Sequence, residues 1–362
     1  MAGAEADRRI RPVRADDALD AEALAGWLRE RLDDLGEGSP ELRQFSGGSS
    51  NLTYLLRFPA REGSPARELV IRRPPRGARR GTAHDMAREY HLQRRLRPRF
   101  RYVPEVLALC EDAAVIGSPF YAMERVEGVV PGRRMPAAVG TDPDTLGALS
   151  ERFLAVWSEL HGIDVQAAGL ADIGRGPGYV ERQVSQWSER YRRARTRNVP
   201  DFERVMRWLE DNRPPDSGYC LIHNDFRLDN MVLAERPPHE INAVVDWELA
   251  TVGDPLMDLG CSLVYWLERG DGRIARRFKR QPTDLPGFPT REQLVRRYGE
   301  ITGRDTEAFA FYGVFGLFRL AVIAQQIYHR YCEGATTNPS FRFFWIGVRY
   351  AHRRCLRMMR AA

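Results

Sequence analysis

The residues best suited to chemistry lie in two short segments of the sequence. Residues 223–230 read His-Asn-Asp-Phe-Arg-Leu-Asp-Asn, and residues 246–248 read Asp-Trp-Glu. A carboxylate can accept or orient the proton of an attacking hydroxyl, and carboxylate and carboxamide oxygens are ligands that Mg²⁺ prefers. Four residues separate Asp225 from Asn230, which is the spacing found in the loop that serves phosphoryl transfer in kinases.

This spacing suggests a role for each polar residue. Asp225 would accept or orient the hydroxyl of the acceptor, and Asn230 would offer its amide oxygen to Mg²⁺. Asp246 follows a strand-like apolar run, from which a kinase presents its metal-binding carboxylate. Glu248 lies two residues further on and could reach a second metal ion, while His223 would brace the loop. The two segments predict transfer of the γ-phosphoryl group of ATP with Mg²⁺ as cofactor.

Each of these residues also has an ordinary structural explanation. Residues 223–230 could form a polar turn between two strands, and Asp246 could cap a turn at the end of its strand. Glu248 could be a solvated surface acid, and for this residue the structural explanation is strong. The occurrence of both segments in one chain favours the chemical interpretation over these alternatives.

The first 127 residues predict a small β-rich lobe. Leucines recur at helical spacing between residues 19 and 35, which indicates a helix ahead of the sheet. The residues before about 17 are charged, and we expect them to be loosely held. Strands are predicted at 42–45, 52–58, 68–73, 103–109 and 120–126, and a helix at 83–96.

After Gly128 the pattern becomes mostly helical. Helices are predicted at 146–160, 180–195 and 202–212 and through most of the chain after 257, with short strands at 219–222, 231–233 and 243–245. With 362 residues the chain can hold two packed lobes. We therefore expect an α+β fold with two lobes, an N-terminal lobe of residues 1–127 that includes the N-terminal helix and a larger helical lobe of residues 128–362.

Charge and composition exclude several classes of function. The formal net charge is +6, but the basic residues are scattered, and Lys279 is the single lysine among 55 basic residues. A nucleic-acid-binding protein would more often carry a basic block or stripe, so no nucleic-acid partner is expected. The apolar run at 309–324 is interrupted by Arg319, which favours a core helix over a membrane span. Five cysteines without a CxxC pair and an N-terminus without an apolar signal segment predict a cytoplasmic protein.

The motifs resemble those of the aminoglycoside phosphotransferase and choline kinase-like superfamily. The resemblance rests on 223–230, 246–248 and the sequence Gly-Asp-Pro-Leu-Met-Asp-Leu-Gly at 253–260, and it extends from about Phe45 to the C-terminal helices. It implies a protein-kinase-like fold and the phosphorylation of a small molecule. A narrower similarity, to the kinase domain that is fused to certain acyl-CoA dehydrogenases, is carried by residues 72–75, 87–90, 109–112, 115–117 and 120–128.

The resemblance implies nucleotide-binding roles in the N-terminal lobe. The loop Gly47-Gly48-Ser49 would cover the ATP phosphates, where glycine lets backbone N–H groups approach closely. Arg72 stands where kinases carry a lysine, and it can bind phosphate through its planar fork. Glu89 would orient Arg72, and Arg73 would point away because neighbouring residues of a strand face opposite sides.

The resemblance also implies roles near the hinge and around the catalytic loop. The backbone carbonyl of Glu124 and the backbone amide of Val126 would hold adenine. Asp258 would support the catalytic loop, and it is also a good candidate for the N-cap of a helix. Asn224 stands where the superfamily commonly has glycine, and asparagine tolerates a left-handed backbone better than most residues.

The acceptor is the least determined part of this function. The C-terminal region carries basic and aromatic residues that suit an acidic or neutral acceptor better than a polycation, namely Arg319, Tyr328, Arg330, Arg342, Trp345 and Arg349. The narrower similarity suggests a hydroxyacid or a hydroxyacyl-CoA. The alternatives are an aminoglycoside-type antibiotic kinase and a nucleotide-binding pseudokinase or regulatory module, the last suggested by Arg72 in place of lysine. The oligomeric state is left open.

Overall fold

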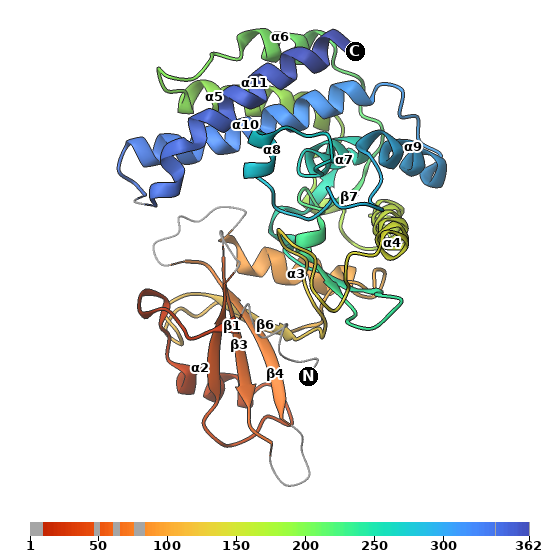
Figure 1. Cartoon of the computed structure of the whole chain (residues 1–362). Coiled ribbons are helices and arrows are strands. Elements are labelled where there is room, and N and C mark those ends of the chain that lie inside the picture. Colours follow the sequence, from red (N-terminus) through yellow and green to blue (C-terminus); the bar gives the residue numbers. More distant parts are fainter. Residues whose placement is uncertain (1–9, 47–50, 61–65, 76–83, 337, 362) are drawn as a thin grey trace. The chain divides into compact units, whose positions relative to one another are not determined.

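The computed structural model describes residues 10–46, 51–60, 66–75, 84–336 and 338–361 (Figure 1). The predicted glycine loop at 47–49 lies outside the described residues. The chain divides into two compact units. Unit 1 comprises Met1–Val130, Pro136–Val139 and Asn230–Leu249, and unit 2 comprises Pro131–Met135, Gly140–Asp229 and Ala250–Ala362.

The division differs from a single boundary near residue 127, because residues 230–249 belong to unit 1. They form a hairpin of strands β8 (Met231–Leu233) and β9 (Ile241–Val244). Val129 and Leu233 exchange two backbone hydrogen bonds of 2.8 Å. This pairing fastens the hairpin to the end of the N-terminal segment.

Six strands in the described part of unit 1 form one antiparallel sheet in the order β1-β2-β3-β4-β6-β5 (Figure 1). The five strands predicted from the sequence are confirmed, with ends that shift by a few residues. β1 was not expected, because the N-terminal residues were predicted to be loose; Ile10 and Arg11 instead pair with Phe45 and Gln44. The strands are β1 (Ile10–Arg11), β2 (Glu41–Phe45), β3 (Leu52–Phe58), β4 (Arg67–Arg73), β5 (Val106–Cys110) and β6 (Phe120–Glu124).

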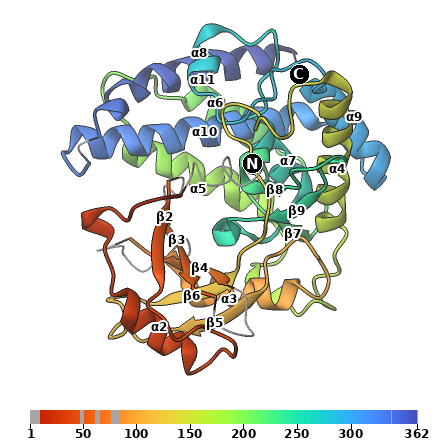
Figure 2. The same ribbon diagram turned by 60° about the horizontal axis from the view of Figure 1, so that its bottom comes forward.

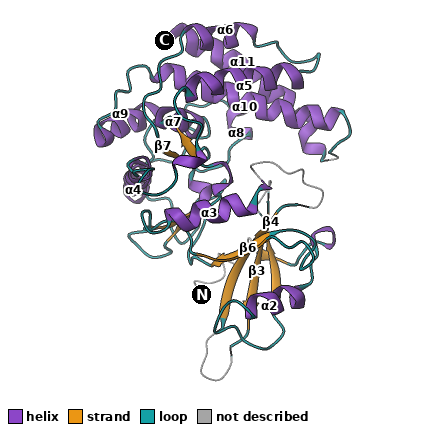
Figure 3. Ribbon diagram, turned by 180° about the vertical axis from the view of Figure 1, so that it is seen from behind, coloured by secondary structure: helices purple, strands orange, loops and turns teal. Residues whose placement is uncertain are grey.

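Two helices cover the two faces of this sheet, α2 (Ala21–Arg29) and α3 (Met86–Leu96) (Figure 3). Leu69 and Ile71 of β4 belong to the apolar cluster that includes α2. Val70, between them, packs in the cluster that includes α3. Because the pleat alternates, Arg72 follows Val70 onto the α3 face and Arg73 lies on the α2 face.

Unit 2 is mainly helical, and α10 runs through its centre beside α11 (Figure 2). By length and composition α10 could span a membrane, but 56% of its most apolar stretch is buried inside the structure, as in the core helix expected from the sequence. Strands β7 (Cys220–Ile222) and β10 (Thr251–Gly253) pair antiparallel, and β10 was not predicted from the sequence. The main helices are α4 (Pro143–His161), α5 (Tyr179–Ala194), α6 (Glu203–Asp211), α7 (Pro255–Leu263), α8 (Arg273–Arg277), α9 (Arg291–Thr302), α10 (Phe309–Cys332) and α11 (Phe344–Ala361).

Two glycines let α7 and α10 approach each other at backbone distance. A Cβ atom at Gly316 would overlap the carbonyl of Gly260, and a Cβ atom at Gly260 would overlap the carbonyl of Tyr312. Both obstacles are backbone atoms of a buried helix pair, which cannot move aside independently. The close crossing therefore requires glycine at both positions.

We expect Gly316→Ala to lower the free energy of unfolding by about 1–3 kcal/mol, the usual cost of overpacking a core. This loss would appear although alanine is the better helix former by about 1 kcal/mol. Gly313→Ala is a matched control one turn earlier, because a Cβ atom there would meet only the mobile end of Met358 at 3.0 Å. Urea denaturation of both variants measures the difference, and equal effects would contradict the close crossing.

Candidate functional site

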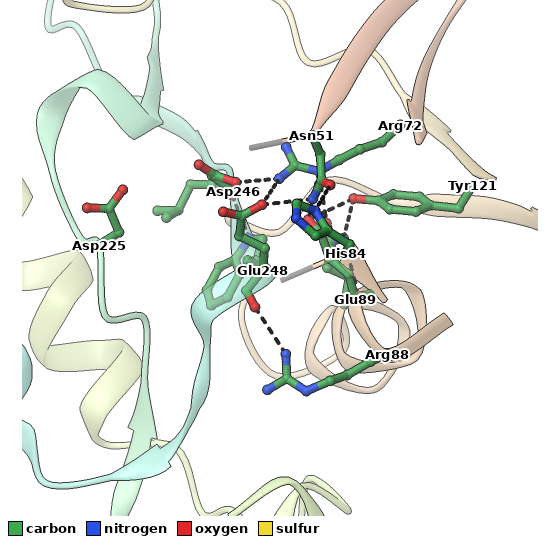
Figure 4. Close-up of polar contacts among 12 residues, drawn as sticks. Asn51, Arg72, His84, Arg88, Glu89, Tyr121, Asp225, Asp246 and Glu248 are labelled. Atoms are coloured by element: carbon green, nitrogen blue, oxygen red, sulfur yellow. Dashed lines mark hydrogen bonds and ion pairs between the residues drawn. The ribbon is translucent and has the colours of Figure 1, made fainter. Parts of the chain in front are cut away.

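Arg72 is the centre of a polar cluster in unit 1 (Figure 4). Its Nε atom lies 3.1 Å from Oε1 of Glu89 on α3. Its Nη2 atom lies 3.2 Å from Oε2 of Glu248 and also pairs with Oδ1 of Asp246. The Arg72 side chain is 10% exposed and that of Glu89 is 2% exposed. The strand, helix and loop that carry these residues thus bring three acids to one buried cation.

The cluster shifts the pKa values of its members in different directions. Burial would lower the pKa of Arg72, but the carboxylates around it, Glu89 first, outweigh burial and raise the pKa. Burial raises the pKa of Glu89, and Arg72 offsets this only in part. Tyr121 donates its hydroxyl to Oε1 of Glu89 at 3.0 Å, and burial and Glu89 raise the pKa of Tyr121. Arg72 therefore stays charged and Tyr121 stays a hydrogen-bond donor at neutral pH.

The β8–β9 hairpin brings Asn230 and Asp246 to neighbouring positions. Met231 lies opposite Val244, and the Val245 amide donates to the Asn230 carbonyl at 2.9 Å. The next residue is Asp246, whose φ of 72° is a left-handed conformation that costs roughly 1–3 kcal/mol and is often found at functional sites.

These two residues have the chemistry that Mg²⁺ requires. They offer a carboxylate and a carboxamide, which are hard oxygen ligands, and the Asp246 side chain is 32% exposed. Among the described residues, no three His, Cys, Asp or Glu side chains form a metal cage. Mg²⁺ usually takes one or two carboxylates and completes its shell with phosphate oxygens and water, so the residues present fit this ion.

Glu248 is buried, and the alternative of a solvated surface acid is wrong. The residue is 7% exposed, and its Oε2 atom accepts a hydrogen bond of 2.8 Å from Nδ2 of Asn51. Nη1 of Arg88 donates to the Glu248 carbonyl at 3.2 Å, and Nδ1 of His84 lies 2.9 Å from Oδ1 of Asn51. The sequence analysis missed Asn51, His84 and Arg88. For Asn51 a signal was present, because this residue is the last of the glycine-containing turn expected at 46–51.

Glu124 is the last residue of β6, and Val126 lies two residues beyond it. The Glu124 amide donates to the Glu105 carbonyl at 2.9 Å, and the strand ends at this residue. Two residues later, the Val126 amide donates to no protein acceptor among the residues that the structure describes. An external acceptor can satisfy this N–H group, as the prediction for adenine requires.

In unit 2, Asp258 holds the loop that carries Asp225. The Asp258 side chain is fully buried, and it accepts hydrogen bonds from the backbone amides of His223 at 3.2 Å and Asn224 at 2.6 Å. Nε1 of Trp157 donates to Oδ2 at 3.0 Å, and Nε2 of His161 lies 3.1 Å from the same atom. Burial would raise the pKa of Asp258, but His161 and the other donors outweigh it and lower the pKa.

The N-cap of α7 is Asp254, and not Asp258 as the sequence suggested. The Asp254 side chain accepts from the Met257 amide at 2.9 Å, and Pro255 occupies the first helical position, which proline favours. Asp258 therefore lies inside the helix with its side chain directed at the loop that carries Asp225. Asn224 has a φ of 65°, the left-handed conformation that was expected to be tolerated.

Asp225 is paired with an arginine of its own loop. Nη2 of Arg227 lies 3.0 Å from Oδ2 of Asp225, and Nε lies 3.0 Å from Oδ1 of Asp229. The Arg227 side chain is 7% exposed, and its guanidinium lies 4.5 Å from the centre of the Tyr265 ring. Burial raises the pKa of Asp229, and Arg227 opposes this shift. Arg227, which the sequence analysis did not single out, restrains the orientation of Asp225.

Arg319 of α10 contacts the same loop. Its Nη1 atom donates to the Asn224 carbonyl at 3.2 Å, and its guanidinium lies 5.3 Å from the centre of the Trp187 ring. Arg190 lies 4.6 Å from the same ring, and burial together with Arg319 lowers its pKa. Over the described ranges, neither arginine has an acid within ion-pair distance. Arg319 thus contacts the loop that carries Asp225, and Arg190 lies against the same Trp187 ring as Arg319.

An apolar cavity of about 420 Å³ lies elsewhere in unit 2, among α7, α9, α10 and α11. Leu263, Val295, Phe309 and Met358 contribute to its lining, but Asp225 and Arg319 do not. We therefore do not assign this cavity to the reaction.

Residues 41–294 match the phosphotransferase enzyme family. The chain belongs to this family.

Two curated relatives of this phosphotransferase are much longer proteins. It is 35% identical to mouse acyl-CoA dehydrogenase family member 10 over 331 residues, which cover 91% of this chain and 30% of the relative. It is 32% identical to human acyl-CoA dehydrogenase family member 11 over 349 residues, which cover 94% of this chain and 43% of the relative. The chain thus spans less than half of each relative.

Solved structures show the same kinase-like fold. A putative aminoglycoside phosphotransferase from Ralstonia eutropha superposes with a TM-score of 0.78 and 29% identity, over 95% of this chain and 99% of that one. Choline kinase from Cryptosporidium parvum gives a TM-score of 0.62 at 12% identity, over 94% and 96% of the two chains. An aminoglycoside phosphotransferase in complex with streptomycin and ATP gives a TM-score of 0.54 at 16% identity. This match covers 85% of the present chain and 90% of that one. The α+β, protein-kinase-like fold and the resemblance found in the sequence are confirmed.

We expect Asp258→Asn to destabilise the phosphotransferase by about 3–5 kcal/mol at neutral pH, because it removes the charge from a buried network. The folded pKa of Asp258 lies below its ordinary value of 3.8. The contribution of the Asp258 charge to the free energy of unfolding is therefore complete above about pH 4. This contribution is lost as the pH falls through the pKa of Asp258 in the folded protein. Urea denaturation should show a difference in the free energy of unfolding between variant and wild type, and this difference should become smaller below about pH 4. Asp211→Asn, at an exposed acid at the end of α6, is the control, and a pH-independent gap would contradict the role of the charge.

Proposed function

We propose that this phosphotransferase moves the γ-phosphoryl group of ATP, with Mg²⁺, to a hydroxyl of a small molecule that carries an anionic group. A hydroxyacid or a hydroxyacyl-CoA has this chemistry. The observation that carries the choice of acceptor is Arg319, which bonds to the Asn224 carbonyl next to Asp225 and has no acid within ion-pair distance over the described ranges. The family supplies the reaction type, and Arg319 supports the acceptor class.

On the donor side, Arg72 would bind a phosphate of ATP through its planar fork, and Glu89 would fix the orientation of that fork through the 3.1 Å ion pair. The loop Gly47-Gly48-Ser49 would cover the phosphates. The Glu124 carbonyl and the Val126 amide would hold the adenine.

Asn230 and Asp246 would hold Mg²⁺. When bound, the ion neutralises the charge that develops on the phosphate oxygens during transfer. The β8–β9 hairpin supports this assignment because it fixes both residues on one rigid element. Glu248 was predicted as a further metal ligand, but its Oε2 atom already accepts hydrogen bonds from Asn51 and Arg72.

On the acceptor side, Asp225 would orient the hydroxyl and take its proton. The hydroxyl oxygen then forms a bond to the γ-phosphorus, the bond to the bridging oxygen breaks, and ADP leaves with the electron pair. The ion pair between Arg227 and Asp225 limits rotation of the carboxylate. Such positioning is the main contribution that a protein makes to phosphoryl transfer.

The charges near Asp225 favour an anionic acceptor over an aminoglycoside. Arg319 and Arg190 both lie against Trp187, and the lowered pKa of Arg190 reflects burial and repulsion by Arg319. An anionic group would relieve this repulsion, whereas a polycationic aminoglycoside would increase it. The acyl-CoA dehydrogenase names of the curated relatives are consistent with an acyl-type acceptor.

The role of Asp225 is tested by Asp225→Asn, which keeps the size of the side chain but removes the proton acceptor. We expect turnover to fall by roughly 10² to 10⁴ fold, the range for loss of a general base. The affinity for ADP should stay within a factor of about two, because Asp225 does not bind nucleotide in this proposal. Steady-state ADP release and calorimetric ADP binding measure the two quantities. A variant with wild-type turnover would refute the mechanism.

The acceptor is tested by an ADP-release screen over hydroxyacids, hydroxyacyl-CoAs, aminoglycosides and choline. We expect turnover with an anionic member, and Arg319→Gln should raise its KM at least tenfold, since a charge-assisted hydrogen bond contributes about 1.5–3 kcal/mol. Arg357→Gln is the matched control, because Arg357 is an exposed arginine of α11. A preference for the cationic compounds would contradict the proposal. ADP binding without turnover on any compound would favour a regulatory module.

A further inference from the structure

Glu248 is held at both ends by donors from unit 1. Its Oε2 atom accepts from Nδ2 of Asn51 at 2.8 Å and from Nη2 of Arg72 at 3.2 Å. Its backbone carbonyl accepts from Arg88 at 3.2 Å. The Glu248 side chain is 8% exposed, against 32% for that of Asp246. A buried carboxylate with a guanidinium and an amide on one oxygen is arranged to anchor the guanidinium.

Asn51 is fixed just as firmly as Glu248. The residue is 2% exposed, and it directly precedes β3. Its Nδ2 atom donates to Glu248, so its Oδ1 atom must accept, and Nδ1 of His84 lies 2.9 Å from that oxygen. Both hydrogen-bonding groups of the Asn51 amide are thus engaged, and they define a single orientation.

The strand register explains why Asn51 can reach this position. Thr53 lies opposite Arg72 in the ladder of β3 and β4, and Leu52 lies opposite Arg73. Asn51, which directly precedes β3, therefore lies beside the end of β4 that carries Arg72. The side chains His84, Asn51, Glu248, Arg72 and Glu89 form one continuous chain of contacts within unit 1 (Figure 4).

We propose that Asn51 is a positioning residue for nucleotide binding, which holds Glu248 and through it the fork of Arg72. Glu248 then belongs to the phosphate-binding part of the site and is not a metal ligand. A metal ion on Oε2 would lie next to the Arg72 guanidinium on the same atom, and the two cations would repel each other. Asp246 also pairs with Arg72, but its greater exposure leaves it accessible to an ion. This inference rests on the proposed use of ATP.

The test separates nucleotide binding from the need for metal. Asn51→Asp keeps the size of the side chain but places a carboxylate against Glu248, and Glu248→Gln weakens the anchor for Arg72. Calorimetry with ADP in EDTA measures binding without metal. The Mg²⁺ concentration that gives half of the maximal rate of ADP release, at saturating ATP, measures the need for metal. Asp246→Asn is the reference for loss of a metal ligand, and Asn212→Asp is the control at an exposed asparagine that follows α6.

We expect Asn51→Asp and Glu248→Gln to weaken metal-free ADP binding at least tenfold and to leave the half-maximal Mg²⁺ concentration within about twofold, since tenfold corresponds to about 1.4 kcal/mol. Asp246→Asn should show the opposite pattern, and Asn212→Asp should resemble wild type. Thermal melts check that each variant folds. If Asn51→Asp does not fold, Asn51→Ala takes its place in the same measurements.

Two results would overturn the inference alone. In the first, the variants bind ADP as wild type does. In the second, they raise the Mg²⁺ requirement as Asp246→Asn does and leave ADP binding unchanged, which would make Glu248 a metal ligand. If wild type itself binds no ADP, the proposed use of ATP is wrong and this inference falls with it.

Discussion

The structure of unit 1 depends on the buried charge of Arg72. A guanidinium that is 10% exposed is tolerated only if acids surround it, and Glu89, Asp246 and Glu248 come from a helix and a loop that are distant from β4 in the sequence. The pleat of β4 must put Arg72 on the α3 face, α3 must present Glu89 to it, and the β8–β9 hairpin must end at Asp246. An error in any of these would leave a buried charge without a partner, so the cluster links the fold to the proposed site.

Unit 2 also contains a buried charge that needs partners, but this charge is negative. Here the buried charge is the carboxylate of Asp258, and its partners are an indole, an imidazole and two backbone amides. The amides belong to the residues just before Asp225, so the hydrogen bonds that stabilise the Asp258 carboxylate also fix the start of the loop that carries Asp225. The loop can hold Asn224 in a left-handed conformation because these hydrogen bonds compensate for its cost.

The sequence was informative where the signal is local. Alternation predicted the central strands and the opposite directions of Arg72 and Arg73. Spacing assigned roles to Asp225, Asn230 and Asp246, and these roles stay predictions. Asn51 and Arg227 were missed because their partners are set by tertiary packing or by the path of a loop, neither of which leaves a periodic pattern. β1 has only two residues and shows no alternation, β10 was not predicted, and the N-cap was assigned to Asp258 instead of Asp254.

The difference between local and distant signals explains why the donor is easier to infer than the acceptor. The residues proposed to handle the phosphates and Mg²⁺ lie in two contiguous segments and one strand, where their spacing can be recognised. The acceptor is proposed to be recognised by Trp187 and Arg190 of α5 and by Arg319 of α10. These helices lie more than a hundred residues apart in the sequence, and only packing brings the three residues together. Acceptor specificity can therefore change by substitution on these two helices without any change in the motif that identifies the family, and relatives with the same catalytic loop need not share an acceptor.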